Sequence, residues 1–249
     1  MSVYSVSGSE YALRREIVRI GRLMYERGLA VATEGNISAR LSADRILVTP
    51  SGVCKGMLEP DQLIVVNLEG ERVGPVTSAN RGLRPTSEMP MHLEAYRQRA
   101  DIGAVVHAHP PTAIALSIAG ISLAECLLPE TIVFLGLVPT TAYATPASAE
   151  NVRAIRELIV GHDAILLQRH GTLTVGRDPW DAFMKAEIVE HSARIALILR
   201  QLGGGPPLPP EEVQKLLAMR QALGLTRPGE AGEFCAVCGV CHPTGQHVR

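Results

Sequence analysis

Three histidines in this chain have the residue type and spacing of a catalytic metal site. His107 and His109 are one residue apart inside an apolar run, so a β-strand there would point both imidazoles to the same side of a sheet. His170 follows a second apolar run, where a turn would present its ring at a sheet edge. A catalytic zinc site needs three protein ligands and one open position. A His-x-His pair alone is equally consistent with hydrogen-bonded core histidines, but the three together predict a zinc site.

Glu88 could supply the proton transfer that such a site requires. It lies just after the Pro85 break, where Ser87 is a plausible N-cap for a helix. A carboxylate at a helix N-terminus and beside a cation stays ionised and can accept a proton. The alternative for an isolated glutamate at this position is a solvated carboxylate at the start of a helix.

Short stretches rich in Gly, Ser, Thr and Asn could bind a phosphate group. Their backbone N–H groups and hydroxyls are the donors that phosphates accept, although each stretch by itself is only a turn. None has the spacing of a P-loop or a dinucleotide fingerprint, so a nucleotide cofactor is not indicated. The stretches are Thr33–Ser38 (TEGNIS), Thr49–Gly52 (TPSG) and Thr86-Ser87.

The elements that would position these residues alternate between helices and short apolar strands. Apolar residues at steps of three and four predict a first helix over Glu10–Arg27, and a small-residue face predicts a long helix over Pro179–Leu202. Further helices are expected from Ser87, over 111–119 and over 147–160 with Ser148 near its start. Strands are expected over 46–49, 63–67, 104–109, 164–168 and 172–175. This order predicts an α/β or α+β fold.

The composition changes near residue 203, where GGGPPLPP stops regular structure. We therefore expect one domain over 1–202, and over 203–249 a linker, one helix at 211–225 and an irregular tail. Cys235, Cys238 and Cys241, followed by His242, have a spacing that suits zinc or an iron–sulfur cluster, but a second cysteine pair is missing. A flexible, reduced tail is the simpler expectation, and Cys126 stands alone in the sequence.

Composition and charge favour a small-molecule partner. The net charge is −1 and no block of like charges occurs, which argues against nucleic-acid binding. No apolar stretch reaches membrane-spanning length and the N-terminus does not read as a secretory signal. We therefore expect no membrane association and a cytoplasmic location.

Five motifs in order resemble the class II aldolase and adducin family over roughly Glu10 to Leu202. They are GNISAR, VTPSG, RPTSEMPMH, AVVHAHPPTAIALS and QRHGTLTVG. The resemblance implies an αβα sandwich around a mainly antiparallel sheet, assembled as a homotetramer with active sites between subunits. It also implies one zinc per subunit and a catalytic acid/base carboxylate. The implied zinc ligands are His107, His109 and His170, the acid/base is Glu88, and the phosphate contacts are Gly35, Asn36, Ser51, Gly52, Thr86 and Ser87.

The activity implied by the resemblance is retro-aldol cleavage of a ketose 1-phosphate to dihydroxyacetone phosphate and an aldehyde. Fuculose, deoxyribulose and methylthioribulose phosphates are the kinds of substrate expected. Glu88 favours aldolases over the 4-epimerases of the family, which typically carry Asp there. A dehydratase or decarboxylase remains an alternative, although the decarboxylases usually have Lys where this chain has Ser87. A non-catalytic, adducin-like assembly module is a further alternative, which retention of the three histidines and the glutamate argues against.

One departure from the family pattern concerns a proton donor. Fuculose-phosphate aldolases of the family carry a tyrosine in the stretch that reads LAECLLPE here, where Leu127 or Leu128 would occupy its place. Another residue or water must then protonate the leaving group, and Glu130 and Tyr143 are the candidates. The substrate therefore need not be fuculose phosphate.

Overall fold

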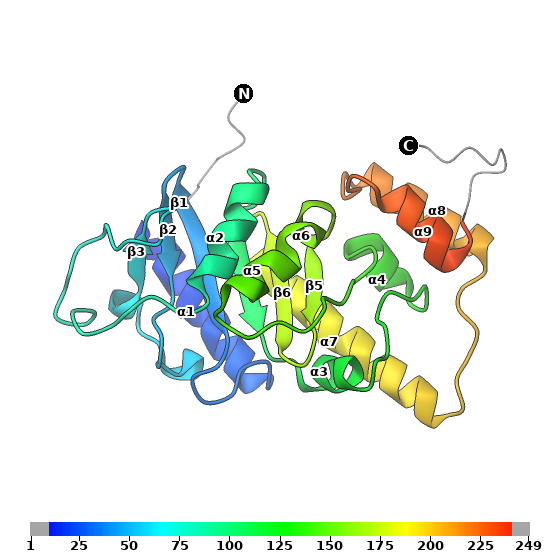
Figure 1. The fold of residues 1–249 in the computed structure, drawn as a ribbon, viewed down its shortest axis with the longest axis horizontal. Helices are drawn as coiled ribbons and strands as arrows, with labels where there is room; N and C mark the ends of the chain where they lie inside the picture. The colour runs from blue at the N-terminus through cyan, green and yellow to red at the C-terminus, as the bar shows by residue number, and fades with distance from the viewer. Residues whose placement is uncertain (1–9, 241–249) are drawn as a thin grey trace.

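A six-stranded sheet with helices on both faces forms the centre of the molecule (Figure 1). The computed structural model describes residues 10–240. The strand order is β3-β2-β1-β4-β6-β5, and every neighbouring pair is antiparallel. The expected α/β fold with a mainly antiparallel sheet is confirmed. The strands are β1 (Asn36–Ser42), β2 (Arg45–Val48), β3 (Ile64–Val66), β4 (Ala104–Ala108), β5 (Ala164–Leu167) and β6 (Gly171–Gly176).

Side-chain alternation along β4 divides the core into two layers. Ala104, Val106 and Ala108 pack with α1 (Glu10–Glu26) and α7 (Pro179–Gln201) on one face. Val105 points to the opposite face, which is covered by α2 (Met89–Gln98), α5 (Ala149–Arg156) and α6 (Leu158–Gly161). Because strand side chains alternate, His107 lies on the same face as Val105, toward α2. The fold thus brings the His-x-His motif and the helix that follows Glu88 to one side of the sheet.

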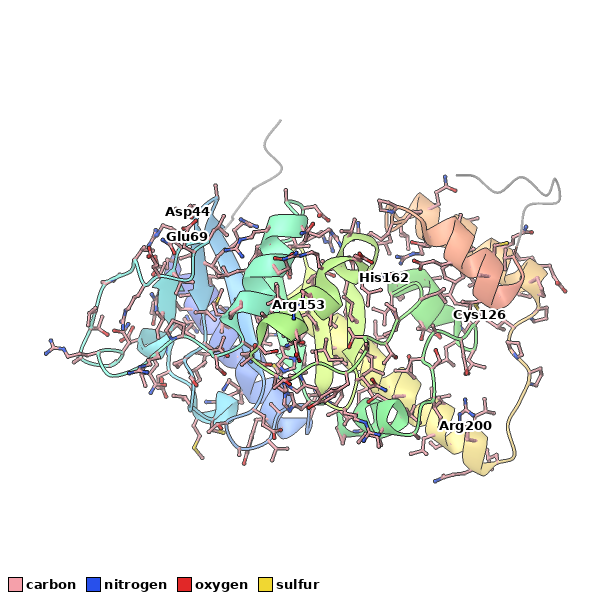
Figure 2. The ribbon with its side chains drawn as sticks, viewed as in Figure 1. Asp44, Glu69, Cys126, Arg153, His162 and Arg200 are labelled. Atoms are coloured by element: carbon pink, nitrogen blue, oxygen red, sulfur yellow. A yellow bond between two sulfur atoms is a disulfide. The ribbon has the colours of Figure 1, made fainter. Side chains whose placement is uncertain are left out.

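The remaining helices lie at the end of the sheet nearest β5. They are α3 (Pro111–Ile118), α4 (Pro129–Phe134), α8 (Pro210–Ala222) and α9 (Glu230–Cys238), and two short 3₁₀ turns occur earlier, at Lys55–Met57 and Pro60–Gln62. Helices α8 and α9 lie beside α4 (Figure 1), on the side where Cys126 and His162 are labelled in Figure 2. None of the helices between residues 10 and 240 has the length and apolar character needed to cross a membrane.

Two local predictions about helix starts have opposite outcomes. Ser148 is the N-cap of α5, as expected, because its hydroxyl accepts hydrogen bonds from the N–H groups of Glu150 and Asn151. Ser87 as the N-cap of the next helix upstream is wrong, because α2 begins at Met89 and Glu88 itself occupies the capping position. The Thr86 hydroxyl, and not that of Ser87, accepts the backbone N–H of Glu88.

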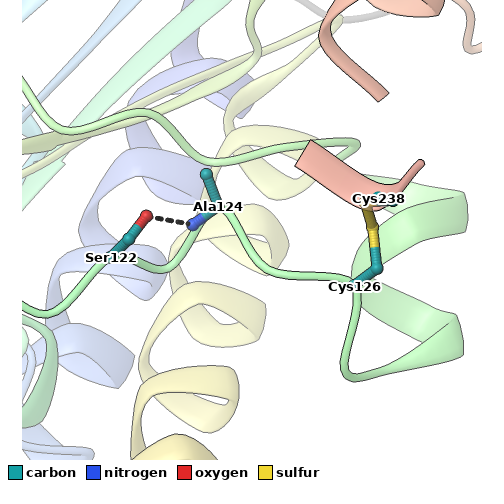
Figure 3. Close-up of a disulfide and its surroundings, with 4 residues drawn as sticks. All are labelled: Ser122, Ala124, Cys126 and Cys238. Atoms are coloured by element: carbon teal, nitrogen blue, oxygen red, sulfur yellow. Dashed lines mark hydrogen bonds between the residues drawn. A yellow bond between two sulfur atoms is a disulfide. The ribbon is translucent and has the colours of Figure 1, made fainter. Parts of the chain in front are cut away.

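The expectation of an irregular, flexible and reduced tail is wrong for the described part of it. Residues Glu230–Cys238 form α9, whose Phe234 is fully buried against Val213 of α8. Cys126, expected to be isolated, is bonded to Cys238 across 112 residues (Figure 3). Periodicity did not reveal α9 because its nine residues have little amphipathic pattern, and burial of Phe234 holds it in place. Cys241 and His242 lie outside the described residues.

Candidate functional site

Glu88, His107, His109 and His170 converge at one end of the sheet. Each offers a ligand atom within 4.8 Å of the others, and among residues 10–240 this is the group found able to hold a metal ion. The four come from three separate elements. Glu88 is at the start of α2, the His-x-His pair is at the end of β4, and His170 is in the turn between β5 and β6.

His107 is fixed in one orientation by the sheet. It pairs in register with Asn36 of β1 and Leu173 of β6, and it is completely buried. Its Nδ1–H donates to the carbonyl oxygen of Thr172 at 2.9 Å, so a neutral ring carries its lone pair on Nε2. That Nε2 lies 2.8 Å from Nε2 of His109. A backbone hydrogen bond therefore aims the second ring nitrogen of His107 into the cluster, where it also lies 2.9 Å from Oε2 of Glu88.

His109 and His170 are placed by backbone contacts at the ends of their strands. The N–H of His109 donates to the carbonyl of Leu29 at 2.7 Å. The turn before His170 contains Arg169 with φ of 62°, and the Arg169 N–H donates to the Ser117 hydroxyl at 2.9 Å. Both rings lie within 5.1 Å of each other and 4.7 Å of the His107 ring, measured between centroids.

Gly171 makes the close approach of these strands possible. A Cβ at this position would overlap the carbonyl oxygen of Ala108 and would lie 3.0 Å from the His107 ring and 3.1 Å from the His109 ring. Only a residue without a side chain lets β6 reach β4 beside the histidines. The glycine in the QRHG sequence is thus part of the architecture of the site.

A buried chain of hydrogen bonds orients the Glu88 carboxylate. Nδ2 of Asn36 donates to Oε2 of Glu88 at 3.1 Å, which leaves Oδ1 of Asn36 to accept from Nε2–H of His92 at 2.6 Å. Nδ1 of His92 then accepts from the Ser38 hydroxyl at 2.7 Å, and that hydroxyl lies 3.0 Å from the Tyr96 hydroxyl. Each group in the chain can have a partner of the correct polarity. The second oxygen of Glu88, Oε1, is buried without a hydrogen-bond partner.

Charge and burial set the protonation states of the cluster. Burial would raise the pKa of Glu88, but His107, His170 and the Asn36 amide together hold the pKa of that carboxyl well below its usual value. Burial, followed by the charge of His107, lowers the pKa of His109 to about 3 and that of His170 to about 4. Burial alone would lower the pKa of His107 too, but Glu88 outweighs it and the pKa of His107 is raised. His109 and His170 are therefore neutral at pH 7.

The donor set fits a divalent metal ion. Nδ1 of His170 and Oε1 of Glu88 are buried without hydrogen-bond partners, and the facing Nε2 atoms of His107 and His109 present two lone pairs unless a proton lies between them. A cation between these groups would satisfy all of them. Three imidazoles with room for a fourth ligand is a typical catalytic zinc arrangement, with Glu88 close enough to act beside it.

The six predicted phosphate contacts lie in segments that the structure brings together. The 49–52 segment is bonded to the 84–86 segment, since Ser51 N–H donates to Arg84 and Thr86 N–H donates to Thr49. Ser51, Gly52 and Ser87 are exposed, whereas Gly35, Asn36 and Thr86 are buried. The Asn36 amide already contacts Glu88 and His92, so its side chain has a role at the carboxylate. The exposed members are the ones free to meet a ligand.

The two candidate proton donors occupy different places. Glu130 lies in the first turn of α4 and lines a surface groove of about 630 Å³ between α4 and α7, together with Leu128 and His191. Tyr143 is 59% exposed in the segment between α4 and α5. Neither belongs to the cluster around Glu88.

Asn36, Ser38 and His92 have roles that the sequence did not reveal. Residues 88, 92 and 96 are separated by steps of four, which places Glu88, His92 and Tyr96 on one face of a helix. Their partners, however, are on β1, for which no strand was expected. The sequence does contain Asn36 within a motif predicted to bind phosphate, but it gave no indication that Asn36 contacts Glu88.

Comparison with known proteins agrees with this geometry. Residues 15–197 match the model of the class II aldolase and adducin N-terminal domain. The chain belongs to the class II aldolase and adducin family. It is 33% identical over 189 residues to an L-fuculose phosphate aldolase of Methanococcus maripaludis, covering 75% of this chain and 96% of that protein. It is 32% identical over 194 residues to a 3-oxo-tetronate 4-phosphate decarboxylase of Escherichia coli K12, covering 76% and 88%.

The fold agrees with solved structures of the family. An L-fuculose 1-phosphate aldolase superimposes with a TM-score of 0.76 at 27% identity, covering 87% of this chain and 100% of that one. The αβα sandwich implied by the sequence motifs is thereby confirmed. Both relatives are named as enzymes that act on phosphorylated compounds, and the identity of this chain to the aldolase, 33%, is nearly the same as its identity to the decarboxylase, 32%.

Proposed function

We propose that this chain is a zinc-dependent aldolase that cleaves a ketose 1-phosphate to dihydroxyacetone phosphate and an aldehyde. The observation that carries the proposal is the Glu88 carboxylate beside three converging histidines, with Oε2 held by Asn36 and Oε1 unpaired. His107, His109 and His170 would hold one zinc ion per subunit. A bound divalent ion supplies a Lewis acid that polarises the carbonyl and hydroxyl oxygens of the substrate.

Glu88 moves the proton in this proposal. In cleavage, the hydroxyl on the carbon that becomes the aldehyde gives up its proton as the carbon–carbon bond breaks, and the electron pair stays on the carbon next to the carbonyl. Glu88, which is ionised at the start, takes up a proton released in the reaction and delivers it to that carbon. In the synthetic direction the same carboxylate removes the proton, as microscopic reversibility requires. Asn36 and His92 hold the carboxylate in one orientation. The buried amide of Asn36 donates to Glu88 and accepts a hydrogen bond from His92, which fixes the amide in place.

The remaining site residues bind and orient the substrate. The backbone and hydroxyl groups of Ser51, Gly52, Thr86 and Ser87, with Gly35, are proposed to hold the phosphate. Glu130 or Tyr143 is proposed to take the proton from the hydroxyl that becomes the aldehyde oxygen in cleavage, and to protonate that oxygen in the synthetic direction. Fixing the phosphate keeps the reacting bond beside Glu88 and reduces the entropy cost of the reaction.

A decarboxylase is the second candidate, favoured by the similarity to the E. coli protein named 3-oxo-tetronate 4-phosphate decarboxylase. Loss of CO₂ from a 3-oxo acid also breaks a carbon–carbon bond next to a carbonyl and leaves an electron pair on the adjacent carbon. Glu88 could protonate that carbon in the same way. The two candidates therefore share the site and differ in the leaving group.

Product analysis distinguishes the two candidates. Purified full-length protein supplied with zinc is incubated with fuculose, deoxyribulose and methylthioribulose 1-phosphates, and release of dihydroxyacetone phosphate is measured. A parallel reaction with 3-oxo-tetronate 4-phosphate measures CO₂. If the chain is an aldolase, dihydroxyacetone phosphate should be released and little CO₂ should form. His109→Ala should abolish the release of dihydroxyacetone phosphate. CO₂ release without dihydroxyacetone phosphate would instead support the decarboxylase.

We further propose a homotetramer with active sites between subunits. The support is family membership and the surface groove beside α4, which opens next to the segment where a donor is expected. Light scattering at micromolar concentration tests the assembly. A fully active monomer would contradict shared sites.

A further inference from the structure

Lys55 is a buried lysine outside the group of residues assigned to the reaction. Its side chain is 2% exposed, and lysine is rarely buried to this extent unless its charge has partners. The Lys55 ammonium donates to the carbonyl oxygen of Val53 at 2.5 Å and to that of Thr33 at 3.0 Å. Both partners are neutral carbonyls, so these hydrogen bonds solvate the positive charge without neutralising it.

The two carbonyls belong to the two segments in which phosphate contacts are expected, 33–38 and 49–53. The segments are joined at one end by the main chain, because Thr49 N–H donates to the Ile37 carbonyl at 3.0 Å and Ile37 N–H donates to the Thr49 hydroxyl at 3.1 Å. At the other end, Thr33 and Val53 are linked through the Lys55 ammonium. The predicted phosphate contacts at positions 35, 36, 51 and 52 lie between these two links along the chain.

Close packing against α1 fixes the backbone of Lys55. Lys55 is the first residue of the 3₁₀ turn at Lys55–Met57. A Cβ on the buried Gly21 of α1 would lie 2.8 Å from the Lys55 carbonyl oxygen, so a residue without a side chain is needed there. The first helix of the domain thus holds the lysine below the two segments.

The charge of Lys55 acts on the neighbouring histidine site. Burial is the main cause of the lowered pKa of His109, and the positive charge of Lys55 adds to the effect of burial. Burial also lowers the pKa of Lys55 itself, to about 8. The amine is therefore mostly protonated at pH 7 and is close enough to the histidines to influence their charge.

We propose that Lys55 is a positioning residue that holds the 33–38 and 49–53 segments in the arrangement that binds the substrate phosphate. The inference rests on the proposed function, since phosphate binding by these segments is part of it. Hydrogen bonds from a charged donor are about twice as strong as neutral ones, so one ammonium can fix both carbonyls. A positive charge in buried surroundings also attracts a dianion more strongly than a charge in water does. Lys55 acts through the backbone of the two segments and does not have to touch the phosphate.

Binding of inorganic phosphate to the zinc-loaded, full-length protein tests this role. Methionine has a similar length and no charge, so Lys55→Met removes both hydrogen bonds. Its dissociation constant for phosphate, measured by calorimetry, should rise about 10-fold or more. Lys215→Met is the matched control, because Lys215 is an exposed lysine of α8 that pairs with Glu212. That variant removes the same charge and should bind phosphate as the unaltered protein does.

Amide hydrogen exchange distinguishes a local role from a general effect on the fold. In Lys55→Met, the 33–38 and 49–53 segments should exchange faster. Strands β4 and β6, which position the histidines, should exchange as before, and zinc content should stay at the level of the unaltered protein. Faster exchange over the whole chain, or no change in the two segments, would overturn the proposal.

The pH dependence of anion binding provides a test that needs no variant of Lys55. Inorganic sulfate is the probe, because it is a dianion throughout the range from pH 7 to 9. The charge of Lys55 is lost as the pH rises through its pKa of about 8, so sulfate affinity should fall over this range. A constant affinity would contradict the proposal.

Controls assign this pH dependence to Lys55. Its titratable and charged neighbours are Cys54, Tyr25 of α1, which packs against the next residue, and Glu34 and His109 beyond Thr33. His109, with a pKa of about 3, keeps its charge state above pH 7. Cys54→Ser and Tyr25→Phe should keep the fall in affinity, and its disappearance in either variant would assign the titration to that residue instead.

The outcomes for Lys55 and for the proposed function are distinguishable. Cleavage of a ketose 1-phosphate, together with equal phosphate affinity in Lys55→Met and unaltered protein, would exclude the role of Lys55 and leave the activity standing. Phosphate binding that depends on Lys55, without cleavage of any ketose 1-phosphate, would support Lys55 and refute the activity. An unaltered protein that binds no phosphate would refute the assignment of the two segments and the role of Lys55 with it.

Discussion

Replacing Glu88 by glutamine separates proton transfer from metal binding. Glutamine keeps the size of the side chain and removes its basicity. In the structure its amide oxygen can accept from Nδ2 of Asn36, as Oε2 does now at 3.1 Å. The amide nitrogen would then take the place of Oε1, which lies 3.4 Å from Nε2 of His170. We therefore expect Glu88→Gln to fold and to retain the three-histidine set.

The expected cost is confined to the proton-transfer step. A positioned general acid or base contributes about 10²–10⁴-fold to rate, so kcat should fall by that factor. This corresponds to about 2.7–5.4 kcal/mol of activation free energy. Zinc content should stay at the level of the unaltered protein, because the histidines supply the three ligands of a catalytic site.

The assay measures turnover, zinc content and exchange of the substrate-derived proton with solvent in one preparation. Turnover and exchange should fall in parallel. Glu94→Gln is the matched control, because Glu94 is on the same helix but pairs with Arg156 away from the histidines. That variant should keep its turnover even if it is less stable.

Loss of zinc from Glu88→Gln, with normal turnover by the fraction that still holds metal, would refute this reasoning. Glu88 would then be a structural ligand and the base would lie elsewhere. Normal proton exchange with slow turnover would equally exclude Glu88 as the group that moves this proton.

Three other changes have expected outcomes. Gly171→Ala should lower zinc affinity and turnover, since its Cβ would overlap the Ala108 carbonyl and press on two ligand rings; calorimetric zinc titration that matches the unaltered protein would contradict this. Asp163→Asn should lower the free energy of unfolding by about 3–5 kcal/mol, because Arg99 and Lys185 lose a buried partner. Burial would raise the pKa of Asp163, but these cations lower it below its usual value of 3.8. The stabilisation by the Asp163 ion pairs is therefore present above pH 3.8 and is lost as the pH falls below it. Denaturant titrations in which the variant remains equally less stable than the unaltered protein in strong acid would contradict this. Zinc affinity should fall as the pH decreases through the raised pKa of His107, because the protonated ring cannot bind the metal. In Glu88→Gln the midpoint of this pH dependence should move to lower pH, since Glu88 raises that pKa. Competition titrations in which the midpoint does not move would exclude Glu88 as the cause of the raised pKa.

Local sequence signals were sufficient to predict the elements that contain the candidate metal ligands. The steps of three and four in the first helix placed Ile17, Ile20 and Met24 on the buried face that they occupy. Strand periodicity put His107 and His109 on the same side of the sheet, and a turn was expected at His170. These features depend on residues within one element and its next turn, which a sequence displays directly.

The features that could not be predicted depend on contacts between distant elements. Asn36 orients Glu88 because β1 pairs with β4 in the register that sets Asn36 opposite His107. No strand was expected there, although the segment NISARLS alternates polar and apolar residues, which is a strand signal that was missed. The bond between Cys126 and Cys238 joins positions 112 residues apart, and spacing along the chain contains no information about that distance in space.

The proposed boundary at Gly203 needs to be considered together with the packing of the C-terminal helices. A chain that ends before Gly203 would be the simplest way to study the histidine site without the C-terminal cysteines. In this structure, however, that truncation removes Val213 and Phe234 from the cluster that covers Ile132 and Leu137 of the catalytic domain. It also removes Arg220, whose guanidinium donates to the carbonyl of Val133.

The truncated chain would therefore lose more than a tail. Exposing an apolar cluster costs about 25 cal/mol for each Å² returned to water, and an uncovered apolar patch promotes association. The affected helix, α4, begins at Pro129, directly after Leu127 and Leu128, one of which is expected to occupy the place of the tyrosine of fuculose-phosphate aldolases. A change in activity on truncation would then reflect the position of α4 as well as the cysteines. Point variants of the full-length chain, in which α8 and α9 stay docked, test the histidine site without moving α4.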